Sequence, residues 1–170
     1  MSDEPQTPDT GANDSPNVSD VPDVVTVERV IPADAAAIFA LLADPARHHD
    51  IDGSGTVRDA KPGSEPLALG SRFGMSMKMG IPYSMVSEVV EFDEDRRIAW
   101  QTRGPGWIGQ QVAGRIWRYE LEPVDGGTLV RESWDIRHES TLTKPLVRRG
   151  AERTRSNMAG TLARIEQLVT

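Results

Sequence analysis

The pattern of apolar and polar positions changes along this chain, and the order of the changes predicts the fold. A run rich in β-branched residues, typical of a strand, comes first. Two segments with helical features follow it, the first with one apolar face and the second with an Asp-Pro start. These three segments are residues 24–31, 32–44 and 44–49. The "GSG" at 53–55 then interrupts the regular structure.

Alternation of apolar and polar residues, typical of half-buried strands, dominates the middle of the chain. Gly, Pro and acidic residues separate the alternating runs, and "DGG" at 125–127 predicts a tight hairpin turn. The predicted strands are residues 56–60, 71–79, 83–93, 97–103, 111–124 and 128–138. With residues 24–31 they form an antiparallel sheet of about six to seven strands.

The pattern becomes helical again from about residue 143 to 168. Apolar residues spaced by four, three and four positions form one stripe, which consists of Met158, Leu162, Ile165 and Val169. Pro145 fits only the first turn of a helix, which places the start. The fold class that follows is α+β, with the long C-terminal helix lying across the concave side of a curved sheet.

Residues 1–23 have the composition of a disordered tail. They hold six acidic residues and no Lys, Arg or aromatic residue, so they bury too little apolar surface to offset the entropy lost on ordering. The tail carries −6 of the net charge of −7. Residues 24–170, which we interpret as a single domain, are therefore nearly neutral and lack the basic charge typical of nucleic-acid binding.

The chain contains no cysteine, which excludes disulfides and thiolate chemistry and favours the cytoplasm. Its start lacks the basic stretch and apolar core of a secretory signal. The longest apolar run, residues 35–43, is nine residues long and too short to cross a bilayer. We therefore expect a cytoplasmic protein.

The order of elements resembles the START-related SRPBCC superfamily, and within it bacterial polyketide cyclase/dehydrase-like proteins. The resemblance covers residues 24–169 and includes "VIPADAAAIFALLADPARHHDIDG", the hairpin "YELEPVDGGTLVRESWD" and the terminal helix. It implies a helix-grip fold whose sheet and long helix enclose a cavity for an apolar small molecule, such as a lipid, acyl or polyketide-like ligand. Members of the superfamily share no single catalytic motif, so the resemblance assigns no catalytic residue.

Given such a cavity, strand alternation predicts which side chains face it. Methionine adapts to irregular apolar guests, and tryptophan adds a large rigid surface, so a wall of these residues suits a binding pocket. The same side chains are also typical of a packed core. The residues expected to face the ligand are Phe73, Met75, Met77, Trp100, Trp117, Tyr119, Glu132, Trp134 and Met158.

Glu132 lies on the inward face of its predicted strand, between Val130 and Trp134. A buried carboxylate must find a donor or stay protonated, because an unpaired buried charge is very costly. Arg115, inward on the neighbouring strand, is the partner we expect. Glu132 is then a ligand-orienting group, a general acid or base, or half of a structural pair. The candidates for catalysis are Glu132, Arg115, Tyr83 and Tyr119.

Two segments suggest a metal or a cofactor, and we expect neither. "HHDID" at 48–52 holds metal-ligand types, but neighbouring histidines on a short helix point apart and lack the i,i+4 spacing of helical metal sites. "GPGWIG" at 104–109 has the spacing of a dinucleotide fingerprint, but a strand follows it instead of a helix. The superfamily resemblance places 48–52 near the pocket mouth, where His49 or Asp50 could touch a ligand, although the segment is also typical of a solvated helix end.

Residues 144–155 hold five cationic residues and one acid, which is typical of a solvated helix face and also fits a docking surface for anionic lipid headgroups or an acidic partner. Three functions therefore remain open. The first is binding of an apolar small molecule in an internal cavity. The second is a polyketide cyclase/dehydratase-type enzyme that uses polar cavity residues. The third is a module that binds a protein or a membrane surface.

Overall fold

The computed structural model describes residues 22–60, 65–79, 81–104 and 114–170, and it describes the side chains of all of these except 58–60, 75, 77–79 and 81–83. The elements follow one another in an α+β order. They are β1 (Val24–Ile31), α1 (Ala35–Leu42), the 3₁₀ helix η2 (Pro45–Arg47), α2 (His48–Ile51), β2 (Val57–Ala60), β3 (Arg72–Met79), β4 (Ile81–Asp93), β5 (Arg97–Arg103), β6 (Arg115–Val124), β7 (Gly127–Asp135), α4 (Lys144–Arg148) and α5 (Ala151–Val169).

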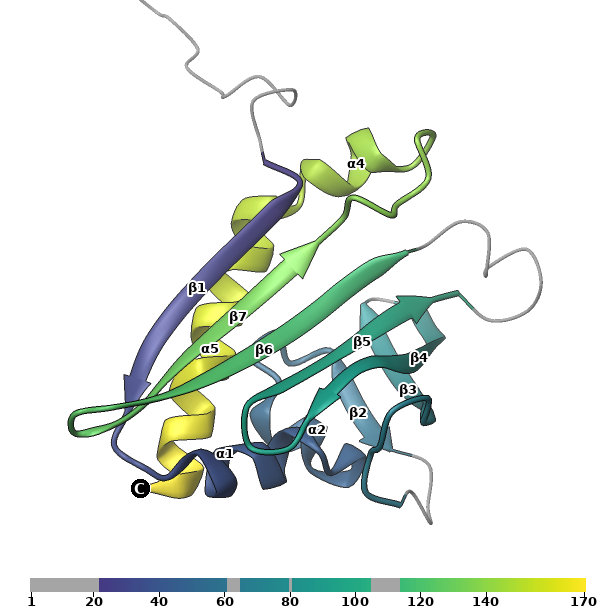
Figure 1. Cartoon of the computed structure of the whole chain (residues 1–170). Helices are drawn as coiled ribbons and strands as arrows, with labels where there is room; N and C mark the ends of the chain where they lie inside the picture. The colour runs from purple at the N-terminus through teal and green to yellow at the C-terminus, as the bar shows by residue number, and fades with distance from the viewer. Residues whose placement is uncertain (1–21, 61–64, 80, 105–113) are drawn as a thin grey trace, which may run out of the picture.

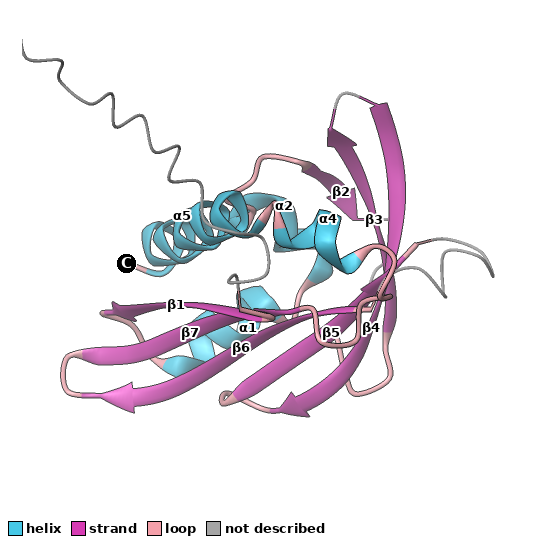
Figure 2. Cartoon of the chain, turned by 90° about the horizontal axis from the view of Figure 1, so that it is seen from above, coloured by secondary structure: helices cyan, strands magenta, loops and turns pink. Residues whose placement is uncertain are grey.

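The strands form one seven-stranded sheet in the order β1-β7-β6-β5-β4-β3-β2, and every neighbouring pair is antiparallel. Consecutive strands from β2 to β7 are joined as a meander, while β1 pairs with the last strand (Figure 1). Seen from above, the sheet curves around the helices, and α5 lies on the concave side (Figure 2). The helix-grip arrangement predicted from the sequence is confirmed.

The start of the chain folds as its residue types predict. In the Asp-Pro segment, the Asp44 side chain accepts a hydrogen bond of 2.9 Å from the Ala46 N–H, and Pro45 opens the 3₁₀ helix. In the "DGG" turn, Gly126 and Gly127 have φ values of 85° and 147°, which residues other than glycine rarely adopt. This hairpin aligns β6 with β7 and thereby sets which residues of the two strands lie opposite each other.

The C-terminal helical region differs from the prediction of one helix over residues 143–168, because it consists of two helices. Helix α4 ends at Arg148 and α5 begins at Ala151. The Gly150 N–H bonds the Val147 carbonyl at 3.0 Å, three residues back, which tightens and ends the last turn of α4. Glycine is also a poor helix former, so the break falls at the position of lowest propensity.

The last strand ends at Asp135, three residues earlier than predicted. The Asp135 carboxylate accepts the backbone N–H of Arg137 at 2.9 Å and also bonds its guanidinium. This local hydrogen bond competes with continued strand pairing and turns the chain towards α4.

The apolar stripe of α5 packs against the sheet, as its spacing predicts. Met158, Leu162 and Ile165 are at most 1% exposed, and α5 contacts β1 and β7. The described helices include none that is long and apolar enough to cross a bilayer.

Residues 1–21 lie outside the described residues, so the disorder of the tail stays a prediction. Asp23, which that prediction included, is described. Its carbonyl accepts the Ile136 N–H at 2.8 Å, and its carboxylate pairs with Arg148 at 2.5 Å and Lys144 at 3.4 Å. These contacts connect the start of β1 to α4.

Candidate functional site

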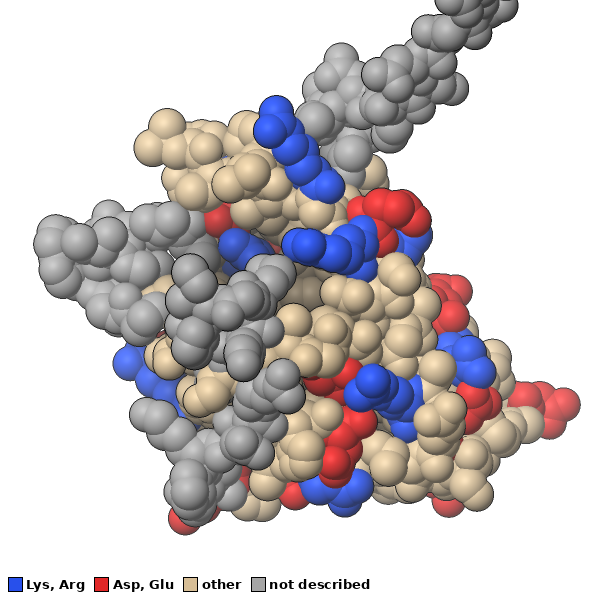
Figure 3. All heavy atoms as spheres, turned by 180° about the vertical axis from the view of Figure 1, so that it is seen from behind, with Lys and Arg blue, Asp and Glu red and all other residues tan. Residues whose placement is uncertain are grey.

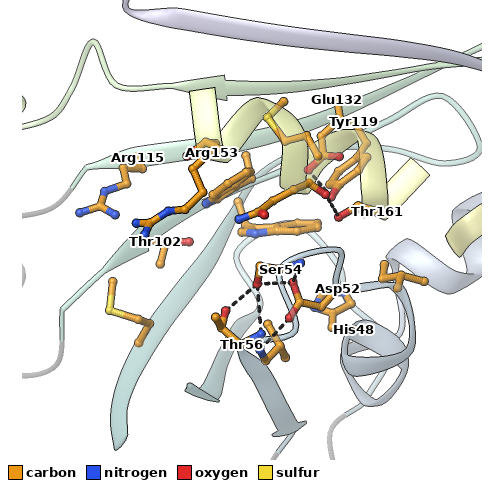
Figure 4. Close-up of a pocket in the computed structure, with 18 residues that line it drawn as sticks. His48, Asp52, Ser54, Thr56, Thr102, Arg115, Tyr119, Glu132, Arg153 and Thr161 are labelled. Atoms are coloured by element: carbon orange, nitrogen blue, oxygen red, sulfur yellow. Dashed lines mark hydrogen bonds between the residues drawn. The ribbon is translucent and has the colours of Figure 1, made fainter. Parts of the chain in front are cut away.

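A pocket of about 620 Å³ lies between the inner face of the sheet and α5 (Figure 4). Its volume is in the range typical of small-molecule sites. Strands β4 to β7 form one wall, α5 forms the opposite wall, and α2 with the loop after it closes a third side. The apolar part of the lining comes from Ile51, Val57, Met85, Trp100, Trp117 and Met158.

The tryptophans that the alternation placed on one face lie side by side across three strands. In the sheet register, Trp117 is opposite both Trp100 on β5 and Trp134 on β7. Trp100 and Trp117 line the pocket. Trp134 is 3% exposed and packs in an apolar cluster with Val25, Met158 and others, so it lies in the core beside the pocket wall.

Tyr119 and Glu132 form a buried polar pair on the pocket wall. They lie directly opposite each other on β6 and β7, and the Tyr119 hydroxyl donates a hydrogen bond of 2.8 Å to Oε1 of Glu132. Glu132 is 2% exposed, and its Oε2 has no hydrogen-bond partner. Glu132 also lines the pocket, so this buried carboxyl with one unpaired oxygen is part of the pocket wall.

Burial raises the pKa of Glu132 to about 8, and the negative charge of Asp52 adds to this effect. The hydrogen bond from Tyr119 opposes the rise, because it favours the charged form, but burial outweighs it. Burial also raises the pKa of the Tyr119 hydroxyl well above 10.0. At neutral pH the pair therefore consists of a neutral tyrosine and a largely protonated carboxyl.

The predicted pair between Arg115 and Glu132 is wrong. Arg115 lies at the start of β6, four residues before Tyr119, which is about 13 Å along a strand. Its Nε instead contacts Oε2 of Glu139 at 3.2 Å, and the Glu139 side chain is 1% exposed. Alternation put both residues on the inward face correctly, but the two lie at different levels along the strands.

Arg153, in the first turns of α5, lines the same end of the pocket as Arg115 (Figure 4). The described residues hold no carboxylate within ion-pair distance of Arg153. Three of the four other cations of the 144–155 segment are paired: Lys144 and Arg148 bond Asp23, and Arg155 lies 3.9 Å from Glu152. The fourth, Arg149, is exposed and does not line the pocket. Arg153 is exposed, as expected for a cation of this segment, but its position at the pocket mouth was not predicted.

The loop after α2 is held by its own side chains. Asp52 accepts hydrogen bonds from the Ser54 N–H at 2.9 Å, the Ser54 hydroxyl at 2.6 Å and the Val57 N–H at 2.7 Å. The Gly53 N–H donates to the Thr161 hydroxyl at 3.1 Å. A Cβ on Gly53 would lie 2.1 Å from the Asn157 carbonyl oxygen, so only glycine lets the loop approach α5 this closely.

His48, and not His49, lies at the pocket. His48 is 4% exposed, and its ring stacks on that of Trp100 with the ring centroids 5.2 Å apart. Its Nε2 lies 2.9 Å from the Leu42 carbonyl oxygen. Since a carbonyl only accepts, Nε2 carries the hydrogen, and burial lowers the pKa of the ring. His49 is exposed and contacts Asp50 at 2.9 Å. Adjacent residues of a helix point about 100° apart, so only one of the two can face inward.

The remaining predicted residues divide between the core and the part of the chain that is not described. Phe73 is 6% exposed and packs edge-on against His48 and Trp100, without lining the pocket. The side chains of Met75, Met77 and Tyr83 lie outside the described residues, as do residues 105–109 of "GPGWIG". Met85, opposite Met75 in the strand register, does line the pocket.

Several pocket residues were missed because they are polar residues of α5. Thr154, Asn157, Met158 and Thr161 follow one another on α5 at spacings of three, one and three, so they share one helix face. This face extends the predicted apolar stripe, so helical spacing was a usable signal. Among the described residues, no three His, Asp or Glu side chains form a group that could hold a metal ion.

A family model described as "Polyketide cyclase / dehydrase and lipid transport" matches residues 22–170. The uncharacterized protein Rv0088 of Mycobacterium tuberculosis is 36% identical over 107 residues, which cover 62% of this chain and 44% of that protein. The chain thus spans less than half the length of this curated relative.

Two solved structures are similar in fold. Protein CV1439 from Chromobacterium violaceum has a TM-score of 0.65 at 14% identity, covering 86% of this chain and 96% of its own. Protein Ms6760 from Mycobacterium smegmatis has a TM-score of 0.64 at 16% identity, and the match covers 89% of this chain and 92% of that protein. At these identities the similarity shows the fold alone.

Proposed function

Because this chain belongs to the polyketide cyclase/dehydrase and lipid transport family, we propose that it binds an apolar small molecule in the pocket between the sheet and α5. The ligand class is a lipid, an acyl chain or a polyketide-like ring system.

One observation carries this proposal: the side chains of the described residues leave about 620 Å³ open between the sheet and α5, and much of the lining is indole, thioether and aliphatic surface. A ligand that buries apolar surface there gains about 25 cal/mol for each Å² removed from water. Met85 and Met158 can adjust to its shape, while Trp100 and Trp117 provide rigid walls.

Binding of N-phenylnaphthylamine, an uncharged apolar dye that becomes fluorescent in dry sites, tests the proposal. Asn157→Trp fills the pocket from α5, and Gln167→Trp on the exposed side of the same helix is the matched control. We expect the wild type and the control to bind the dye and the Asn157 variant to bind it much more weakly. Equal binding by all three proteins would place the dye outside the pocket and contradict the proposal.

A second candidate is an enzyme of the cyclase/dehydratase type, which the Glu132 carboxyl favours. A carboxylic acid with a pKa near the working pH can protonate a carbonyl or hydroxyl oxygen of a bound ligand as a general acid. This role predicts that Glu132→Gln abolishes turnover of a poly-keto substrate while dye binding stays the same. Turnover that survives the substitution would exclude Glu132 as the acid.

A further inference from the structure

We propose that the ligand is an amphiphile: a carboxylate at one end binds Arg153 at the pocket mouth, and an uncharged oxygen about 12 Å away accepts a hydrogen bond from the Glu132 carboxyl. This proposal rests on the proposed function, and it adds the polarity of the ligand and its direction in the pocket.

The inner end of the pocket offers a hydrogen-bond donor without a partner. Glu132 is 2% exposed and makes no ion pair with a described cation, so its carboxyl stays protonated. Oε1 accepts the Tyr119 hydroxyl, which leaves the acidic proton on Oε2. Among the described residues, Oε2 is the one buried side-chain nitrogen or oxygen atom that lacks a hydrogen bond.

An unmade buried hydrogen bond is unfavourable, and a ligand can satisfy it only with an acceptor. A ketone, ether or hydroxyl oxygen meets this requirement. A carboxylate does not suit this position, because its charge would be buried beside Asp52 and far from both arginines. The inner end therefore selects an uncharged oxygen.

The mouth of the pocket has the opposite character. Arg153 has no carboxylate partner in the described part of the chain, and Arg115 uses only its Nε to contact Glu139. The acids that line the pocket are Asp52 and Glu132, and Asp52 is already occupied by three donors of its own loop. On the face seen in Figure 3, Lys and Arg side chains flank a hollow in the upper half of the view.

A guanidinium without a carboxylate beside an apolar pocket can bind a carboxylate with two parallel hydrogen bonds. One unpaired arginine balances one negative charge, so a carboxylate fits this mouth better than a group of higher charge. The negative end of the ligand therefore lies at the mouth, where water also solvates it.

The separation between the two ends follows from the backbone. Along α5, Arg153 and Thr161 are eight residues apart, which is about 12 Å of helix. Along β6, Arg115 and Tyr119 are separated by about 13 Å of strand. Both elements thus place the arginines at one end and Tyr119, Glu132 and Thr161 at the other, as Figure 4 shows. Between the two ends, Trp100, Trp117 and Met158 supply apolar surface, and Thr154 and Asn157 of α5 supply polar groups.

Displacement of N-phenylnaphthylamine by three matched compounds tests the proposal. They are octadecanoic acid, a keto-octadecanoic acid whose ketone lies about 12 Å from the carboxylate, and the methyl ester of that keto acid. We expect the keto acid to bind about fivefold more tightly than octadecanoic acid and about tenfold more tightly than its ester. Equal affinities for all three would overturn the proposal.

Two pairs of variants assign the two ends. Arg153→Gln should weaken both acids about tenfold and leave the ester unchanged, whereas Arg149→Gln, which removes an exposed charge of the same segment, should change none of them. Glu132→Met should remove the preference for the ketone, and Glu132→Gln, which keeps an N–H donor, should retain it. If the preferences survive Arg153→Gln and Glu132→Met, the assignment of the two ends is wrong.

The same experiment separates this inference from the proposed function. If the dye binds in the pocket but neither acid displaces it better than the ester does, the apolar pocket stands and the amphiphile is wrong. If the dye itself does not bind the wild type, the proposed function fails first.

Discussion

Tyr119 and Glu132 lie opposite each other on β6 and β7, and their 2.8 Å hydrogen bond lies at the inner end of the pocket. The tyrosine satisfies one carboxyl oxygen, and the other has no hydrogen-bond partner among the described residues. This pair therefore connects the stability of the sheet to the chemistry of the cavity.

The stability of the fold should fall with rising pH through Glu132. Its pKa is raised from 4.5 to about 8 on folding, so above pH 4.5 the native state holds a proton that the unfolded state has lost. The contribution of Glu132 to the free energy of unfolding is fully present below about pH 4.5 and is lost as the pH rises to about 8. At about 1.4 kcal/mol per pH unit, the total loss is up to about 5 kcal/mol.

Urea unfolding of the wild type and of Glu132→Gln measures this contribution. The pH values lie between 5 and 9, roughly the range in which Glu132 is protonated to different extents in the folded and unfolded states. The difference in unfolding free energy between the two proteins isolates Glu132, because other groups titrate alike in both. We expect the Gln variant to gain stability relative to the wild type as pH rises. A difference that does not change with pH would show that Glu132 is not protonated in the fold.

Tyr119→Phe should destabilise the protein by about 1–2 kcal/mol, because it leaves both oxygens of a buried carboxyl without a partner. It should also raise the pKa of Glu132 further, since the lost hydrogen bond favoured the charged form. The measurement is a double-mutant cycle in urea with Glu132→Met. Equal effects of Tyr119→Phe in both backgrounds would show that the tyrosine does not act through Glu132.

Gly53→Ala should cost about 3 kcal/mol, because its methyl group would overlap the backbone of α5 at Asn157 and Thr161. Gly55→Ala is the matched control: its φ of 66° strains an alanine, but its Cβ meets open space, so we expect about 1 kcal/mol. Thermal unfolding of both variants gives the comparison. A larger loss in Gly55→Ala would show that the loop does not pack on α5 as described.

Trp117→Phe and Trp134→Phe should separate the pocket wall from the core. Trp117 is half-buried and lines the pocket, so its loss should remove a large part of the fluorescence change on ligand binding. Trp134 is 3% exposed in the core, so its loss should lower stability by roughly 2 kcal/mol and leave ligand affinity nearly unchanged. A ligand whose affinity drops equally in both variants would contradict this division.

The local pattern of the sequence predicted much of this molecule. Alternation along β5, β6 and β7 assigned Trp100, Trp117 and Glu132 to the inward face, and helical spacing assigned Met158 to the side of α5 that packs on the sheet. These predictions succeed because the direction of a side chain along one element depends on a short-range periodicity that the sequence displays.

What only the tertiary structure decided is the level at which inward residues meet. The register of β6 against β7 gave Glu132 a tyrosine instead of Arg115, and the rotation of a one-turn helix turned His48 inward and His49 outward. The start of α5 likewise brought Arg153 to the pocket from a segment that looks like solvated surface. Register, rotation and approach are set by contacts between residues far apart in the chain, and a local pattern contains no information about them.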